Sequence, residues 1–384
     1  MYVEPASSPR SPVSAREYTA VDRELKYRVL TRRELNRALL ARQQLLDRVR
    51  RPLPRAVEQM GGIQAQYAPS AYIGLWSRVE GFERDALTRA LERKALVQAT
   101  LLRGTIHVVS RRDFWPWRSA VHETDDAWLR RVRPDLAGRH RAAADRKLRA
   151  ALVNGPRKRD ELVGLVGKDG WYAASVDLVR VPPSGTWEQR RADLYALAEN
   201  WLGPNDADVE AGRELLVRRY LAAFGPAAVG DIRSWSRLTR DQVERALERI
   251  GARSFRDEAE KALFDVPRAP LPAADTPAPP RFLPTWDAVL LVHARRTGVL
   301  PEEYRPRIFN TKLPFSMHTF LLDGSVAGAW KVERTKAKAE LVLQPFAPVP
   351  RKLREPLREE AERLVRWHED HAVSYAVRWT KSTS

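Results

Sequence analysis

Three successive stretches of the sequence each predict helices followed by a β-hairpin, and this repeated order limits the fold more than any other feature. In the first stretch, Thr31-Arg32-Arg33-Glu34 has the Thr-x-x-Glu form of a capping box and predicts a helix start. The apolar runs Leu96 to Leu102 and Thr105 to Val109, separated by Arg103-Gly104, predict the hairpin. Further helices are expected over residues 54–60, 68–76 and 84–94.

The same order recurs twice, more weakly. In the second stretch, helices are expected over residues 142–153 and 159–166, followed by a strand over 176–181 with a wing tip at 182–186. In the third, helices over 213–224 and 227–235 precede a second capping box at Thr239 and paired strands within 255–264. We therefore expect an α+β chain with three tandem helix-turn-helix (winged-helix) units at 28–138, 139–208 and 209–266, after a disordered tail at 1–27.

The segment from Pro267 to Pro284 contains seven prolines. Proline removes a backbone donor and clashes with the preceding helical turn, so no helix is expected there. We place the main domain boundary in this connection, 267–284, although an ordered proline-rich crossing over the surface fits equally. Beyond it, β-like runs at 288–292, 319–322, 325–330 and 339–343, the turn signal Asp323-Gly324 and a helix over 353–367 predict a β-rich domain, 285–384, with a covering helix.

Charge and cysteine content limit the function. The 384 residues carry 67 Lys+Arg against 49 Asp+Glu, a formal net charge of +18. This excess favours a polyanionic partner, nucleic acid before a membrane surface or ribosome. The absence of cysteine excludes disulfides, zinc-thiolate sites, iron–sulfur clusters and a cysteine nucleophile. No apolar run approaches the roughly 18 residues that span a bilayer. We expect a cytoplasmic, nucleoid-associated protein without a cofactor, a metal or a membrane.

The stretch Gly61-Gly62-Ile63-Gln64-Ala65-Gln66-Tyr67 follows the helix expected over 54–60. Its two glycines should end that helix, since glycine readily adopts the left-handed conformation of helix ends. If the next residues are extended, the side chains of Gln64 and Gln66 share a face. Two neutral amides on one face can hold a water molecule without ionising. The same pair can instead cap backbone groups near a helix end, and spacing alone favours that interpretation.

Taken together, these features resemble the AlkZ-like (YcaQ-like) winged-helix DNA glycosylases of bacteria. The resemblance runs from about Leu30 to the end of the chain. The family's fold implies three tandem winged-helix domains and a C-terminal β-barrel-like domain around DNA, and its members excise N7-alkylated purines, including bulky adducts and in some cases interstrand crosslinks. The matching residues are Leu35 to Leu46 with its Ala-Arg-Gln core, Gly62-Ile63-Gln64-Ala65-Gln66, Leu102 to Val109, Leu283-Pro284-Thr285-Trp286-Asp287, Asp323-Gly324 and Ala327-Gly328-Ala329-Trp330.

The family's catalytic motif is Gln-Φ-Gln or Gln-Φ-Asp, where Φ is usually aliphatic. By this resemblance Gln64 and Gln66 occupy its two catalytic positions, with Ala65 as a small Φ residue. An N7-alkylated purine is cationic and already a good leaving group, so the protein must mainly position water and stabilise positive charge on the sugar. The motif contains no lysine, so strand cleavage through a Schiff base is not expected. The resemblance implies a monofunctional glycosylase, a monomer that acts on double-stranded DNA carrying alkylated purines.

DNA contacts are predicted in the first wing and in basic runs of the helical units. Exposed polar groups of wings often bind phosphates, yet the alternation of His107 with Ile106 and Val108 also fits an ordinary solvent-facing strand position. The basic runs are either solvated faces or, distributed over three units, the lining of a phosphate-binding groove. The candidate DNA-binding residues are Arg103, Thr105, His107, Arg111, Arg112, Arg157, Lys158 and Arg159.

Other interpretations of the chain remain. A non-catalytic winged-helix DNA-binding protein, such as a transcription regulator, is the alternative, because that fold hosts many functions. Regulators usually dimerise on spaced half-sites, whereas three units in one chain favour enclosure of a lesion by a monomer. His368 and His371 lack the His-Glu-x-x-His spacing of zinc hydrolases and are expected at a solvated helix end. Four tryptophans in apolar helical contexts are expected in the core: Trp115, Trp117, Trp128 and Trp235.

Overall fold

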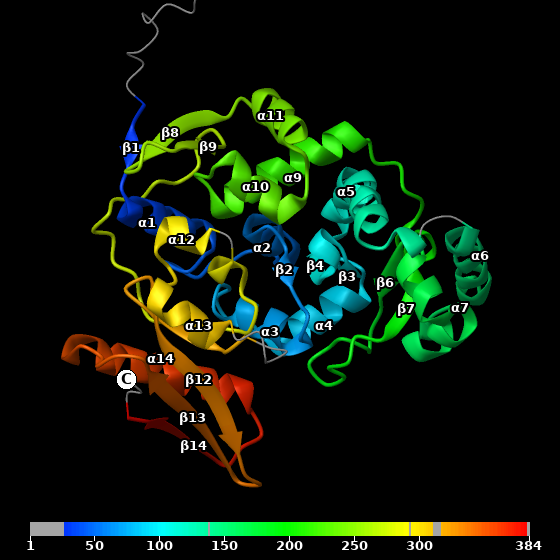
Figure 1. The fold of residues 1–384 in the computed structure, drawn as a ribbon. Coiled ribbons are helices and arrows are strands. Elements are labelled where there is room, and N and C mark those ends of the chain that lie inside the picture. Colours follow the sequence, from blue (N-terminus) through cyan, green and yellow to red (C-terminus); the bar gives the residue numbers. More distant parts are fainter. Residues whose placement is uncertain (1–26, 137–138, 292, 310–315, 382–384) are drawn as a thin grey trace, which may run out of the picture.

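The computed structural model describes residues 27–136, 139–291, 293–309 and 316–381. These form an α+β fold with three sheets, as Figure 1 shows. The expected tail, residues 1–27, lies almost wholly outside the described residues. Within the described ranges, no helix is long and apolar enough to cross a membrane.

In the first predicted unit, one helix begins and another ends at the residues that the sequence signals predict. The capping box at Thr31 is present, with its hydroxyl and the Glu34 carboxylate each bonded to the other residue's backbone. Gly61 ends the second helix in the left-handed conformation. The 22-residue helix α5, which follows the hairpin, was not predicted as one element. The helices are α1 (Arg32–Arg42), α2 (Leu53–Met60), α3 (Ala68–Trp76), α4 (Arg84–Glu92) and α5 (Arg111–Val132).

A six-stranded sheet runs through the first two predicted units, in the order β2-β4-β3-β6-β7-β5. The predicted first hairpin is confirmed, with Leu96 opposite Ser110 and Thr100 opposite Ile106. Its strand β3 also pairs with β6, Gln98 lying opposite Arg180, so the strands of the first two predicted wings share one sheet. The strands are β2 (Ile63–Gln64), β3 (Leu96–Thr100), β4 (Ile106–Ser110), β5 (Arg157–Lys158), β6 (Leu178–Arg180) and β7 (Leu194–Leu197).

The ranges predicted as the second and third units are mainly helical. The helix α7 (Arg159–Ala173) is longer than predicted and is interrupted at Gly167, whose φ is +74°. The capping box at Thr239 is present. The short strand β1 (Val29–Leu30) pairs in parallel with the strand β8, so the start of the first unit joins the sheet of the third. The remaining elements are α6 (Arg139–Leu152), α8 (Ala198–Leu202), α9 (Val209–Phe224), α10 (Val229–Ser236), α11 (Arg240–Arg249), β8 (Arg253–Asp257) and β9 (Ala262–Asp265).

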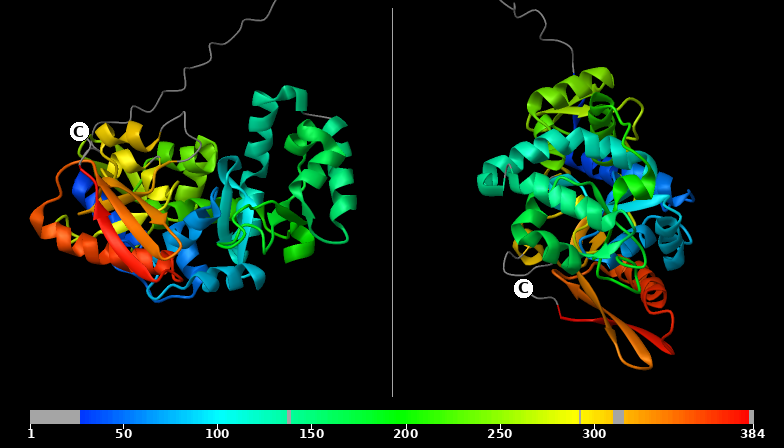
Figure 2. Two further views of the ribbon diagram at one scale, coloured as in Figure 1. Left: turned by 90° about the horizontal axis from the view of Figure 1, so that it is seen from below. Right: turned by 90° about the vertical axis from the view of Figure 1, so that its right-hand side faces the viewer.

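The C-terminal region contains a five-stranded sheet covered by α14 (Arg351–His368). The predicted turn is confirmed, with φ of +46° at Asp323 and +81° at Gly324. The sheet is open, with β10 and β14 at its edges, so the expected barrel-like form is not observed among the described strands. The strands are β10 (Arg281–Leu283), β11 (Thr319–Leu322), β12 (Ser325–Arg334), β13 (Lys338–Pro345) and β14 (Ser374–Trp379). Figures 1 and 2 show this sheet far from the pair α6 and α7.

Two expectations about individual segments are wrong. The predicted strand over 288–292 is a short 3₁₀ helix (Ala288–Leu290), because the Asp287 side chain accepts a hydrogen bond from the Val289 amide and starts a turn; residue 292 itself lies outside the described residues. Trp128 is 39% exposed, and the Arg237 guanidinium covers its ring at 4.3 Å. The other three tryptophans are buried as expected. Two short helices complete the fold, α12 (Ala294–Thr297) and α13 (Arg305–Ile308).

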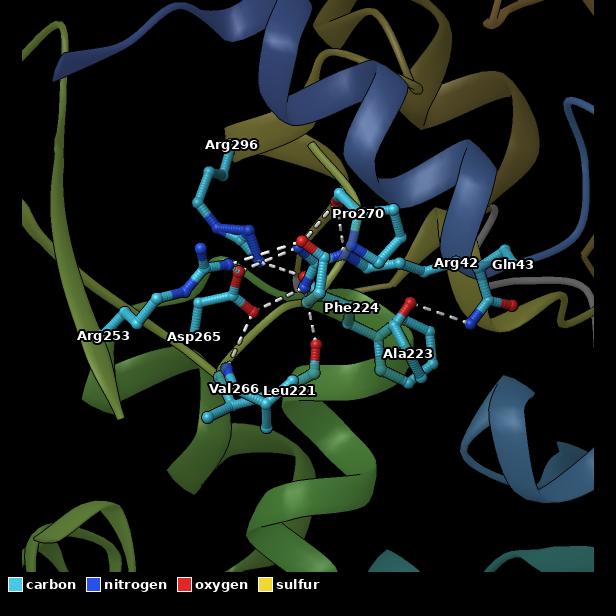
Figure 3. A network of polar contacts seen from close by, with 11 residues as sticks. Arg42, Gln43, Leu221, Ala223, Phe224, Arg253, Asp265, Val266, Pro270 and Arg296 are labelled. Atoms are coloured by element: carbon cyan, nitrogen blue, oxygen red, sulfur yellow. Dashed lines mark hydrogen bonds and ion pairs between the residues drawn. The ribbon is translucent and has the colours of Figure 1, made fainter. Parts of the chain in front are cut away.

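The proline-rich connection is an ordered crossing fastened by a buried ion pair, drawn in Figure 3. Nη1 of Arg42 lies 2.6 Å from Oδ1 of Asp265, and Nη2 lies 2.9 Å from Oδ2. Their side chains are 1% and 0% exposed. The same guanidinium donates to the carbonyls of Leu221 and Pro270. One charged group therefore joins α1, the end of α9, β9 and the crossing.

Replacing Arg42 with Met should destabilise the protein by about 3 kcal/mol. The buried Asp265 carboxylate then keeps only Arg253, a partly exposed partner at 3.1 Å, as its counter-charge. Urea denaturation followed by tryptophan fluorescence measures the change. Arg240, whose ion pair with Glu244 is exposed, is the control, and Arg240→Ala should cost at most about 0.5 kcal/mol. Equal effects of the two substitutions would show that the buried pair does not hold the fold together.

Candidate active site

The two glycines before the motif are required by both conformation and packing. Gly61 and Gly62 have φ of +73° and +76°, where side chains are strained. A Cβ on Gly61 would lie 3.0 Å from the Ala223 Cβ, and one on Gly62 would lie 3.2 Å from Trp117 and Val109. The chain therefore leaves α2 pressed against α5 and α9 and enters β2 in a fixed direction.

Gln43, to which the sequence alone assigned no role, supports the same turn from α1. Its Nε2 donates to the carbonyls of Met60 and Ala223, each at 3.1 Å. The Gln44 Nε2 donates to the Ala56 carbonyl. The sequence signal that could have identified Gln43 was the Ala-Arg-Gln core of the first helix, which contains Arg42 and Gln43. In the structure Gln43 holds the end of α2 in place.

An ion network fastens α2 to α5 and α9 beside the turn. Arg219 on α9 binds Asp113 on α5 at 2.7 Å and Glu58 on α2 at 3.1 Å. Burial raises the pKa of Asp113 despite the Arg219 charge. Burial acts the same way on Glu58, but hydrogen bonds from Arg55 and Ser110 and the Arg219 charge outweigh it and lower the pKa of Glu58. These ion pairs therefore fix the end of α2, just before the motif, in addition to the steric contacts at Gly61 and Gly62.

The two candidate glutamines differ in their surroundings. Gln64 lies in β2 opposite His107 and is 9% exposed, which confirms an extended backbone at this position. Its side chain makes no hydrogen bond to any described residue. Gln66 is exposed, and its Oε1 accepts a hydrogen bond from the Ile106 amide at 3.0 Å. Gln66 therefore caps a backbone group, but at the start of strand β4 and not near a helix end as the alternative interpretation expected. The amide of Gln64 has no partner among the described residues.

Gln64 borders a small cavity of about 10 Å³ between β2, α3 and the segment after β10. This volume is on the order of one water molecule. The Trp286-Asp287 segment, to which the sequence assigned no role, lines the cavity together with Arg78. The Arg78 Nη2 lies 2.9 Å from Oδ1 of Asp287, and both side chains are buried. Sequence spacing gave no signal for this pairing, since the two residues are 209 positions apart.

The first-wing residues point inward, which corrects the view of His107 as solvent-facing. His107 is 3% exposed, because apolar clusters cover both faces of β4. Burial, with the Arg103 charge, lowers the pKa of His107 to about 3. Arg103 donates to the Trp235 carbonyl at 2.6 Å, and Thr105 donates to the Leu102 carbonyl. Burial lowers the pKa of Arg103 to about 10. These contacts brace the hairpin.

The other candidate DNA-binding residues lie on the surface at two places. Arg111 and Arg112 are exposed at the start of α5, and Arg157 and Lys158 are exposed on β5. The strand β5 is the edge opposite β2, about 24 Å away at the usual strand spacing. Arg159 is half-buried, with its guanidinium 6.0 Å from the Trp171 ring. The structure therefore separates this basic run from the motif by the width of the sheet.

No group of three or more His, Asp or Glu side chains suited to a metal ion occurs in the described part of the chain. His368 instead contacts Glu369 at 3.1 Å. His371 has an 88% exposed side chain.

The buried His107 should make stability depend on pH. Its pKa is lowered from 6.5 to about 3 on folding, so below pH 6.5 the unfolded chain binds a proton that the folded chain excludes. His107 therefore costs no stability above pH 6.5. As the pH drops from 6.5 toward 3, it lowers the free energy of unfolding by up to about 1.4 kcal/mol per pH unit. His107→Gln should reduce the slope of unfolding free energy between pH 6.5 and 5. The exposed His371→Gln is the control, and equal slopes for both variants would contradict the buried assignment.

Comparison with known proteins identifies the family to which this chain belongs. Residues 57–367 match the family model described as DNA glycosylase AlkZ-like. The fold is similar to that of the Streptomyces sahachiroi DNA glycosylase AlkZ, with a TM-score of 0.75 and 20% identity, covering 92% of this chain and 100% of that chain. No curated protein matches the sequence. Because the family model spans the motif, the six-stranded sheet and most of the C-terminal region, this chain belongs to the AlkZ-like DNA glycosylase family.

Proposed function

We propose that this DNA glycosylase hydrolyses the N-glycosidic bond of cationic N7-alkylated purines in double-stranded DNA, with water positioned by Gln64 and Gln66. The observation that carries the proposal is the amide of Gln64, which bonds no residue that the structure describes and borders a cavity the size of a water molecule. Bulky adducts and interstrand crosslinks belong to the same cationic class. Membership of a glycosylase family sets aside the non-catalytic regulator as the main interpretation.

The chemistry suits neutral amides. Alkylation at N7 places a positive charge on the purine, so the base departs without a strong acid, and the sugar develops oxocarbenium character. The enzyme must then supply a placed water and oriented dipoles facing the cationic sugar. An amide oxygen accepts a hydrogen bond from the water but does not ionise near neutral pH.

The two glutamines take unequal parts in this proposal. The Gln66 Oε1 is already bonded to the Ile106 amide, which fixes the plane of its side chain and leaves Nε2 and one lone pair for a ligand. The Gln64 amide makes no hydrogen bond within the described ranges of the chain. We therefore assign the main water contact to Gln64 and a positioning contact to Gln66.

The remaining features fit a monofunctional enzyme that encloses DNA as a monomer. The motif from Gly61 to Tyr67 contains no lysine, so no Schiff base forms there. We interpret the three helix-and-hairpin units as winged-helix domains and assign phosphate contacts to the exposed cations at the start of α5 and on β5. The sheet width between β2 and β5, about 24 Å, is less than one turn of duplex, about 34 Å, so one DNA molecule can reach both edges.

Gln64→Ala should lower the single-turnover rate of N7-methylguanine excision by about 100-fold or more, the usual effect of removing one preorganised dipole. Gln66→Ala should lower it by about 10-fold, because its amide is partly committed to the backbone. Excision is read by alkaline cleavage of the abasic product, and DNA affinity is measured on the same samples.

The matched control is Gln189→Ala, which removes an exposed glutamine of the loop between β6 and β7 and should leave the rate unchanged. Rates within threefold of wild type for both motif variants, with DNA affinity preserved, would overturn the proposed mechanism.

DNA affinity should fall steeply with salt, because each phosphate bound by the protein releases counterions. The Arg157→Ala, Lys158→Ala double variant should reduce the slope of log K against log salt by about 1 for each phosphate that it no longer binds. Arg358→Ala removes an exposed arginine paired with Glu355 and Glu362 and should leave the slope unchanged. A double variant with the wild-type slope would remove β5 from the DNA interface.

A further inference from the structure

Asp287 places a carboxylate at the cavity that Gln64 borders. Its Oδ1 accepts hydrogen bonds from Arg78 Nη2 at 2.9 Å and from the Val289 amide at 3.1 Å. Its Oδ2 makes no hydrogen bond to any described residue. The side chain is 6% exposed. One oxygen of a nearly buried carboxylate is thus committed to Arg78 and Val289, and the other has no partner among the described residues.

The backbone before Asp287 is held in an unusual conformation. Trp286 has φ of +59°, which is rare for a bulky residue and costs about 1–3 kcal/mol. Its amide donates to the Ser316 hydroxyl at 2.7 Å. Conformations of this kind persist where the surroundings enforce them, commonly at functional sites. Here the strained residue precedes the carboxylate and lines the same cavity.

Arg78 compensates the charge of Asp287 without closing the cavity. Its side chain is 1% exposed, and its Nη1 donates to the Gly74 carbonyl at 3.0 Å. Gly74 has no side chain to fill this region, where an added Cβ would contact both Arg78 and Pro284. The guanidinium therefore holds the carboxylate from the α3 side, while Gln64 approaches from β2.

We propose that Asp287 is a further catalytic residue of this glycosylase, whose Oδ2 accepts a proton from the attacking water and faces the positive charge on the sugar. The inference rests on the proposed function, because it uses the water that Gln64 holds. It adds a negative charge and a proton acceptor, which the two amides cannot provide.

Atoms and charge balance in this step. The C1′–N9 bond breaks and its electron pair stays on N9, which neutralises the cationic purine and releases it as a neutral base. The water oxygen bonds to C1′, and one water proton passes to Oδ2 of Asp287 and then to solvent. The products are the alkylated base, an abasic sugar carrying the new hydroxyl, and one proton.

The simpler role for Asp287 is structural, as the cap of the 3₁₀ helix Ala288–Leu290 and the partner of Arg78. That role uses only Oδ1 as an acceptor, and the carbonyl oxygen of an asparagine can replace it. Asp287→Asn therefore separates the two roles, because it keeps the size and the acceptor but removes the charge and the proton acceptor.

The test measures single-turnover release of N7-methylguanine from a duplex, together with DNA affinity and thermal unfolding. Asp287→Asn should lower the rate by about 100-fold or more, the usual contribution of a positioned base, at unchanged affinity. In Asp287→Asn the buried Arg78 loses its counter-charge, which can impair folding. The double variant Arg78→Met, Asp287→Asn removes this unpaired charge, so it keeps the test decisive if the single variant folds poorly. The control is Asp231→Asn, which neutralises a largely buried partner of Arg296 outside the cavity.

Loss of excision in both Asp287 variants, with the Asp231 variant active, supports a catalytic carboxylate. A rate within threefold of wild type in Asp287→Asn, or recovery of the rate in the double variant, overturns it and leaves a structural role. Failure of the proposed function looks different, because Gln64→Ala then retains excision whatever the Asp287 variants do.

Discussion

The buried ion pair between Arg42 and Asp265 is the contact on which the placement of the candidate active site depends. Its partners are 223 positions apart in the sequence, and neither charge is exposed. Each charge is tolerated because it is paired, and Arg253 gives Asp265 a second, partly exposed partner. The pair fixes α1 against α9 and β9. Gln43, the next residue, then bonds the Met60 carbonyl at the end of α2. The turn at Gly61 and Gly62 is held through this chain of contacts, and β2 follows from it.

The candidate site is assembled from parts of the chain that are far apart. The strand β2 supplies Gln64, α3 leads to Arg78, and the segment after β10 supplies Asp287. The proline-rich crossing positions the segment after β10 at the cavity. Arg42 and Arg37 hold this crossing by donating hydrogen bonds to the carbonyls of Pro270 and Thr276. The neutral amide of Gln64 and the charge-compensated carboxylate of Asp287 both border a space the size of a water. This set of groups suits the proposed hydrolysis of a bond whose leaving group already carries positive charge.

Local signals in the sequence predicted local structure. The capping boxes at Thr31 and Thr239, the helix end at Gly61 and the turn at Asp323-Gly324 are confirmed because each depends on residues within one turn of chain. The predicted limits of the three units stay predictions, and the pairing of β1 with β8 and of β3 with β6 crosses them. His107 was misplaced because alternation marks an exposed face only where one side of a sheet meets water. The ion pair of Asp287 left no local signal, since its partner Arg78 lies 209 positions away.

The central claim is that the enzyme acts on bases that leave as neutral molecules because they begin as cations. The most direct measurement compares single-turnover release of N7-methylguanine and of uracil from otherwise identical duplexes by the wild-type protein. The account predicts release of N7-methylguanine and no detectable release of uracil, since no acid in the site serves a neutral leaving group. Release of uracil at a comparable rate, or no release of N7-methylguanine, would contradict it.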